Sequence, residues 1–188
     1  VDAHVEHANP HDGAWSLPNG EAFYQLRLKR YTTTDATAES IHQLGLSEVD
    51  RITRRMREIL NGLGYPTAES VGVLMNSLNE ESRFLYPDTP NRKDIVVGDY
   101  SAIVAETKEA VGSAFRQLPR ADVVVRAVPE YSEKTAAGGY YMSPALDGSR
   151  PGVFYANLYD IQQTPKYGMR TLAFHEAIPG HHFQNALN

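Results

Sequence analysis

The spacing of apolar residues divides the chain into a helical first part and a mixed last part. The longest regular pattern covers residues 93–118, where apolar side chains recur at helical intervals for about six turns. Its apolar positions are Val96, Val97, Tyr100, Ile103, Val104, Thr107, Val111, Ala114, Phe115 and Leu118. We expect Pro119 to end this helix, because proline lacks the backbone N–H that would continue the hydrogen-bond ladder.

A second amphipathic pattern covers residues 47–64. Ser47 precedes the carboxylate of Asp50 by three residues, a spacing typical of a capping box. The apolar stripe of this helix consists of Val49, Ile52, Met56, Ile59, Leu60 and Leu63. The arginines that lie mostly off the stripe are Arg51, Arg54, Arg55 and Arg57, and we interpret them as a solvated face. Further helices are predicted over residues 20–31 and 68–79, with a short helical turn over 37–45.

After residue 120 the pattern changes from helical to extended. Short runs rich in β-branched and aromatic residues predict strands over 122–129, 138–142 and 152–158, with a hairpin turn in 147–151. A final helix is predicted from about Gly168. We therefore expect an α+β fold, mostly helical, in which a small sheet packs beside the last helix. The expected division is a helical part over 1–120 and a sheet with its helix over 121–188, both within one fragment of a larger domain.

Charge and composition exclude several classes of function. Lys and Arg number 18 and Asp and Glu number 23, a net charge of −5 that argues against a nucleic-acid partner held by phosphate contacts. No apolar run approaches the length that crosses a bilayer, so we expect no membrane-spanning segment. Cysteine is absent. Any bound metal must therefore be held by His, Asp, Glu or water.

Candidate chemistry is concentrated in the last predicted helix. Residues 175–182 read His-Glu-Ala-Ile-Pro-Gly-His-His, and the string follows an apolar turn. Neutral imidazoles bind zinc, and a carboxylate next to a ligand can act on a water at the open coordination position. The residues therefore predict a zinc site with His175 as a ligand and Glu176 as the general base.

The second ligand is harder to assign from the sequence. The usual zincin spacing places a second histidine four residues after the first, where this chain has Pro179. On a regular helix His181 lies about 120° from the direction of His175 and about 9 Å along the axis. His182 lies within about 20° of that direction but about 10.5 Å away. A bulge at Pro179 and Gly180 would bring His181 back to the ligand position, so His181 is preferred and His182 is the alternative.

The interruption itself supports a functional interpretation. Within a helix, proline costs about 3 kcal/mol and glycine about 1 kcal/mol. Three histidines and a glutamate around a Pro-Gly pair are therefore a poor way to build an ordinary helix. This is the main reason, on the residues alone, for expecting a metal.

The string His-Glu-Ala-Ile-Pro-Gly-His-His-Phe-Gln, residues 175–184, closely resembles the signature of a bacterial family known as domain of unknown function 885. Residues 13–24, 41–49 and 147–155 also resemble segments of that family. The resemblance implies a divergent zincin-like metallopeptidase that uses Zn²⁺, with His175 and His181 as ligands. It implies hydrolysis of peptide bonds by a metal-bound water, with Glu176 as general base.

Members of this family are longer than 188 residues, and they carry a further glutamate after the signature. By analogy, that glutamate would be the third zinc ligand. The resemblance therefore implies that this chain is a fragment, inactive by itself, and that the remainder of the parent chain supplies the third ligand.

Substrate-binding residues are expected near the strand over 152–158. If this strand is the edge of the sheet, it can pair with an extended peptide, with Asn157 holding a substrate amide. Tyr155 and His182 are further candidates for substrate contact. Tyr140, Tyr141 and Tyr155 are each candidates for stabilising the oxyanion, although each is also explained as an ordinary strand aromatic.

Two other functions remain compatible with the sequence. One is a catalytically degenerate zincin that keeps the fold as a binding protein. The other is a metal-dependent hydrolase of esters or of non-peptide amides, since zinc-water chemistry does not choose among them. The sequence is compatible with a cytoplasmic or an exported protein and indicates neither.

Overall fold

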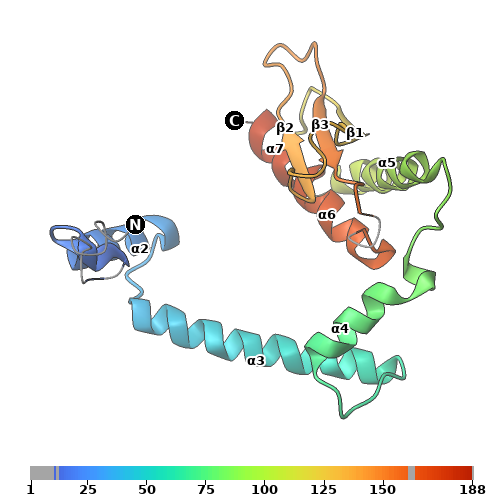
Figure 1. Ribbon diagram of the computed structural model, residues 1–188. Helices are drawn as coiled ribbons and strands as arrows, with labels where there is room; N and C mark the ends of the chain where they lie inside the picture. The colour runs from blue at the N-terminus through green and yellow to red at the C-terminus, as the bar shows by residue number, and fades with distance from the viewer. Residues whose placement is uncertain (1–10, 12, 161–163, 188) are drawn as a thin grey trace, which may run out of the picture. The chain divides into compact units, whose positions relative to one another are not determined.

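The computed structural model describes residue 11, residues 13–160 and residues 164–187. The chain forms two compact units, Val1–Val71 and Gly72–Asn188, which are described separately. Figure 1 shows the first unit as helices and the second as helices around a small sheet.

The first unit contains a short 3₁₀ turn, η1 (Gly13–Ser16), and two helices, α2 (Gly20–Thr32) and α3 (Ala38–Gly62). The patterns over 37–45 and 47–64 belong to one helix, α3, and this is a correction to the predicted start. Thr37 caps it by accepting a hydrogen bond from the Ser40 backbone, and the Ser40 hydroxyl accepts one from the Thr37 backbone in return. The Ser47 hydroxyl instead donates to the carbonyl of Leu44 inside the helix, so Ser47 does not cap it.

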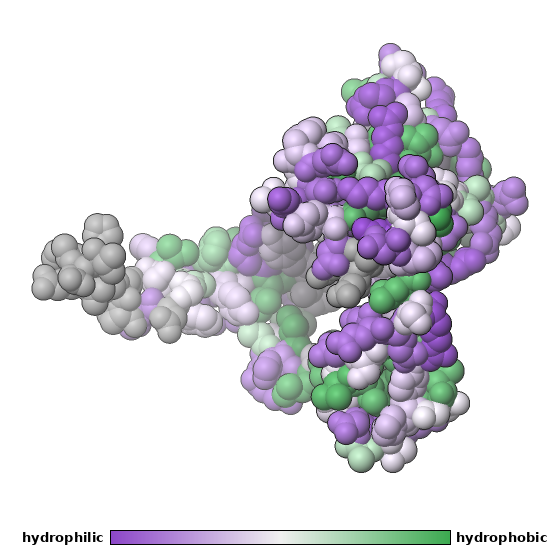
Figure 2. Space-filling model, turned by 45° about the vertical axis from the view of Figure 1, so that its right-hand side comes forward, coloured by the Kyte–Doolittle hydropathy of each residue, from purple (hydrophilic) through white to green (hydrophobic). Residues whose placement is uncertain are grey.

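The arginines of α3 lie on a solvated face of the helix, as expected from their positions in the sequence. Arg51, Arg54 and Arg55 pair with Glu48, Asp50 and Glu58 one helical turn away, and these side chains are exposed. Several apolar residues of the same helix are exposed as well: Leu44, Leu46, Val49, Ile52 and Ile59. Figure 2 shows apolar side chains, in green, among hydrophilic ones on the helical part of the chain.

The second unit begins with α4 (Val71–Glu80), which starts at the boundary, then η2 (Ser82–Phe84) and α5 (Arg92–Val111). The last helices are η4 (Lys166–Gly168), α6 (Met169–Glu176) and α7 (Gly180–Ala186). α5 stops well before Pro119, which corrects its predicted end at 118. Gly112 follows its last residue, and the Ala114 amide turns back to the Val111 carbonyl, so the helix has ended before the proline is reached.

Three strands form one mixed sheet: β1 (Val123–Ala127), β2 (Gly139–Met142) and β3 (Gly152–Ala156). Their order is β1-β3-β2, with β3 parallel to β1 and antiparallel to β2. The α+β fold class is confirmed. The expectation that residues 152–158 form a substrate-binding edge is wrong for β3, because β1 and β2 occupy both of its hydrogen-bonding sides.

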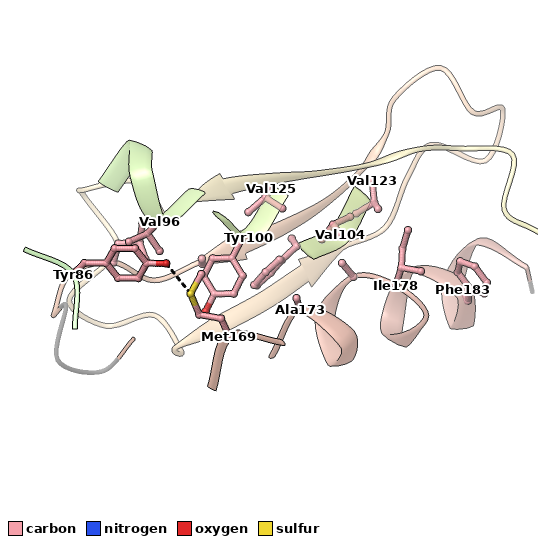
Figure 3. Close-up of a cluster of buried hydrophobic side chains, with 14 residues drawn as sticks. Tyr86, Val96, Tyr100, Val104, Val123, Val125, Met169, Ala173, Ile178 and Phe183 are labelled. Carbon is pink, nitrogen blue, oxygen red and sulfur yellow. Dashed lines mark hydrogen bonds between the residues drawn. The ribbon is translucent and has the colours of Figure 1, made fainter. Parts of the chain in front are cut away.

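The core of the second unit lies between the sheet and the helices (Figure 3). Val125, Phe154 and Tyr141 are paired across the three strands and therefore share one face of the sheet. Phe154 is fully buried and meets the ring of Tyr100 edge-on, with centroids 5.1 Å apart. α5 lies against β1 and α6 against β2, so this face is the one covered by helices.

These contacts place α5 with the sheet. The compact units divide between Val71 and Gly72, whereas the composition change suggested a division after residue 120. In the described part of the chain, no helix has the length and apolar character needed to cross a bilayer.

Candidate metal centre

The last helix is broken at Pro179 and Gly180. α6 ends at Glu176, the Ile178–Pro179 peptide bond is cis, and α7 starts at Gly180. The sequence predicted a bulge within one helix, whereas the structure has two helices. The amide of His182 bonds the carbonyl of Ala177, which fixes the start of α7 against the end of α6.

Gly180 makes this break possible by its lack of a side chain. A Cβ atom at this position would lie 1.8 Å from the His175 carbonyl oxygen and 2.4 Å from that of Phe174. These are backbone atoms, so they cannot move aside as the end of a flexible side chain could. The close approach of α7 to the last turn of α6 therefore requires glycine.

The break brings together the two predicted ligands and the predicted base. One ligand atom from each of His175, Glu176 and His181 lies within 4.8 Å of the others. The two imidazole rings are 4.9 Å apart between centroids and perpendicular. His175 is exposed, His181 is partly buried and Glu176 is buried. The site therefore opens to solvent on one side while its carboxylate lies at the inner end.

This donor set fits zinc. Two atoms bonded to one zinc at about 2.1 Å are at most about 4.2 Å apart, so small side-chain rotations suffice to close the cluster. His₂-carboxylate ligation is common for zinc. The same geometry allows Glu176 either to bind the ion or to act as a base beside it.

His181 is oriented by its own helix. Its Nδ1 lies 2.8 Å from the side-chain oxygen of Gln184, one turn further along α7. A carbonyl oxygen only accepts, so Nδ1 carries the proton and Nε2 keeps its lone pair for a metal. Sequence reasoning missed Gln184, although its spacing of three residues from His181 was a usable signal.

His182 has a different environment and is not part of the cluster that His181 forms with His175 and Glu176. His182 is only 2% exposed. Its Nδ1 lies 2.8 Å from the Tyr141 hydroxyl and its Nε2 lies 3.1 Å from the Ala121 carbonyl oxygen. Both nitrogens are therefore engaged, and a substrate contact by His182, as the sequence suggested, would require these bonds to open.

The remaining predicted substrate residues are not brought to the cluster. Tyr155 follows Phe154 on β3 and so points to the opposite face of the sheet, where it stacks on Tyr140 with centroids 5.0 Å apart. The Asn157 amide donates to the carbonyls of Glu133 and Ala136 and so holds that loop. Of the three candidate tyrosines, Tyr141 is the one that contacts the histidines.

The burial of His182 predicts a pH dependence of stability. Burial lowers the pKa of His182 below the usual histidine range; the Ala121 carbonyl and Asp122 oppose the shift, and Lys108 adds to it. The unfolded chain therefore binds a proton at a higher pH than the folded chain does. The contribution of His182 to the free energy of unfolding is complete above about pH 6.5. It is lost as the pH falls below that value, by at most about 1.4 kcal/mol per pH unit.

Urea titrations at several pH values, with hydrogen exchange of β3 peptides as the readout, measure this pH dependence of stability. Between pH 7.5 and 5.5 the wild type should lose more stability than His182→Gln. An equal loss in the two proteins would contradict the assignment.

The comparisons with known proteins agree with the sequence resemblance. A family model described as "Bacterial protein of unknown function (DUF885)" matches residues 1–188. A crystal structure described as a "putative lipoprotein" from Colwellia psychrerythraea is similar, with 40% identity and a TM-score of 0.87. The match covers 99% of this chain and 32% of that chain, so the chain spans about a third of that relative. No curated protein matches. The chain belongs to the bacterial family of unknown function DUF885.

Proposed function

We propose that this chain carries the zinc site of a metal-dependent hydrolase that cleaves peptide bonds. The observation that supports the proposal is the convergence of His175, Glu176 and His181 within 4.8 Å across a helix break. On an unbroken helix, His181 would lie about 9 Å along the axis from His175. The break is the structural feature that makes shared ligation possible.

Each residue has a distinct role in the proposal. His175 and His181 hold the ion through neutral imidazoles, with Gln184 setting the proton position of His181. When bound, zinc supplies positive charge that polarises a carbonyl and lowers the pKa of a water. Glu176 accepts a proton from the attacking water and passes it to the leaving amine. Its burial and its position within 4.8 Å of both histidines support this role.

A catalytic zinc normally has three protein ligands besides its water. With Glu176 acting as base, the described residues supply two. We propose that residues outside these 188 supply the third, and that hydrolysis is a property of the longer protein. The relative from Colwellia psychrerythraea is about three times the matched length.

Glu176→Gln tests whether Glu176 acts as the general base or as a metal ligand. In the longer protein that the proposal requires, the change should abolish hydrolysis of a fluorescent peptide library and leave zinc affinity within a few-fold of wild type. The physical reason is that the amide keeps the size of the carboxylate but cannot accept the proton. Zinc affinity is measured by calorimetry on the same preparations.

Glu106→Gln is the matched control. Glu106 is an exposed carboxylate paired with Arg170 in the same unit, so its loss should change neither property. A large loss of zinc affinity in Glu176→Gln would instead make Glu176 a ligand. Tight zinc binding without hydrolysis in the wild type would favour a degenerate binding protein, and cleavage of matched ester substrates alone would contradict the peptidase assignment.

A further inference from the structure

We infer that Tyr141 and His182 form a positioning pair that fixes the ring of His181 for metal binding. The inference rests on the proposed zinc site and extends it to two residues that would not touch the metal. Its basis is a series of contacts that connects Ala121, two residues before β1, through His182 on α7 to Tyr141 on β2 and then to His181.

The first step is the proton position on His182. The Ala121 carbonyl oxygen 3.1 Å from Nε2 can only accept a hydrogen bond, so Nε2 carries the proton. In a neutral imidazole, Nδ1 is then an acceptor. The Tyr141 hydroxyl, 2.8 Å from Nδ1, must therefore donate to it. The Ala121 carbonyl therefore fixes the direction of both hydrogen bonds of His182.

The second step is the placement of the Tyr141 ring. Its hydroxyl is held by His182, and its ring lies nearly parallel to that of His181, at 21° with centroids 6.5 Å apart. Gly152 on the neighbouring strand provides the space for the Tyr141 side chain, because a Cβ atom at position 152 would lie 2.3 Å from the Tyr141 hydroxyl oxygen. The tyrosine ring thus forms one wall beside the partly buried His181.

These contacts also decide between two roles for Tyr141. Its hydroxyl proton is directed at His182, so the phenol is not free to donate to a substrate oxygen in this arrangement. Gln184 fixes the proton of His181 from α7, and Tyr141 limits the tilt of the ring from β2. Together they restrict the orientation of the His181 ring, whose centroid lies 4.9 Å from that of His175.

Tyr141→Phe tests the pair with little change in shape, since it removes the hydroxyl and keeps the ring. We expect zinc affinity to fall about 10- to 100-fold, the usual effect of losing a group that orients a ligand. We also expect the visible spectrum of the Co²⁺-substituted protein to change, because the His181 ring is then free to tilt. His182→Phe, which keeps a ring but has no nitrogen to accept from the Tyr141 hydroxyl, should behave in the same way.

Tyr140→Phe is the matched control, because Tyr140 is the preceding residue and points to the other face of the sheet. It should leave both zinc affinity and the Co²⁺ spectrum unchanged. Hydrogen exchange of β3 in each variant separates a loss of folding from a loss of positioning. Nitrogen NMR of His182 in the metal-free wild type should show the Nε2–H tautomer.

The outcomes separate this inference from the proposed function. If the wild type binds zinc and Tyr141→Phe binds it equally well with the same Co²⁺ spectrum, the positioning role is overturned. An Nδ1–H tautomer of His182 would also overturn it. If the wild type binds no zinc in either this chain or the longer protein, the proposed function fails, whatever the tautomer.

Discussion

Replacing Gly180 by alanine is expected to destroy the proposed metal centre and to destabilise the second unit by about 3 kcal/mol or more. The added Cβ would lie 1.8 Å from the carbonyl oxygen of His175, a distance that no side chain tolerates. Relief requires α7 to move away from α6. That movement separates His181 from His175, so zinc binding should be lost with the stability.

Hydrogen exchange of peptides from β3 measures the stability of this unit. The one tryptophan, Trp15, lies in the first unit and does not report on it. Gly98→Ala is the control, because Gly98 is exposed in the middle of α5 with nothing within 4 Å of an added Cβ. That change should stabilise the protein by up to about 1 kcal/mol. Equal zinc affinity in Gly180→Ala and the wild type would refute the steric argument.

His181→Ala is expected to lower zinc affinity by more than about 100-fold, which exceeds the usual effect of losing an orienting residue. The alanine removes one of the two proposed imidazole ligands and leaves the backbone of α7 intact. His175→Ala should have an effect of the same size. Calorimetric titration with zinc, in this chain and in the longer protein, provides the measurement.

His42→Ala controls for adventitious binding by surface histidines, since His42 is exposed on α3 in the other unit. It should leave zinc affinity unchanged. His182→Ala distinguishes the two neighbouring histidines: it should reduce zinc affinity less than His181→Ala does. The opposite order would make His182 the ligand and overturn the assignment.

The local pattern was sufficient for the type of most elements. Helical periodicity and short β-branched runs predicted the helices and the three strands, because both depend on neighbours a few residues away. Element ends were harder. The pattern over 93–118 stayed apolar beyond Val111, but α5 ends there, and the cap at Thr37 rather than Ser47 starts α3.

The sequence by itself determined which residues are the candidates for the proposed chemistry. His175, Glu176, His181 and the Pro-Gly interruption are adjacent in the chain, so their types and order were readable, and they led to the preference for His181. The absence of cysteine and the acidic balance likewise follow from composition alone. These properties need no knowledge of distant contacts.

The tertiary structure decided what each neighbouring residue does. His182 is separated from its partners Tyr141 and Ala121 by 41 and 61 residues, so no local pattern could show that both its nitrogens are engaged. Strand order placed β3 at the centre of the sheet and turned Tyr155 away from the histidines. Hydrogen-bond partners and strand faces depend on which distant segments pack together, and that packing is settled by burial of the whole core rather than by any short stretch of sequence.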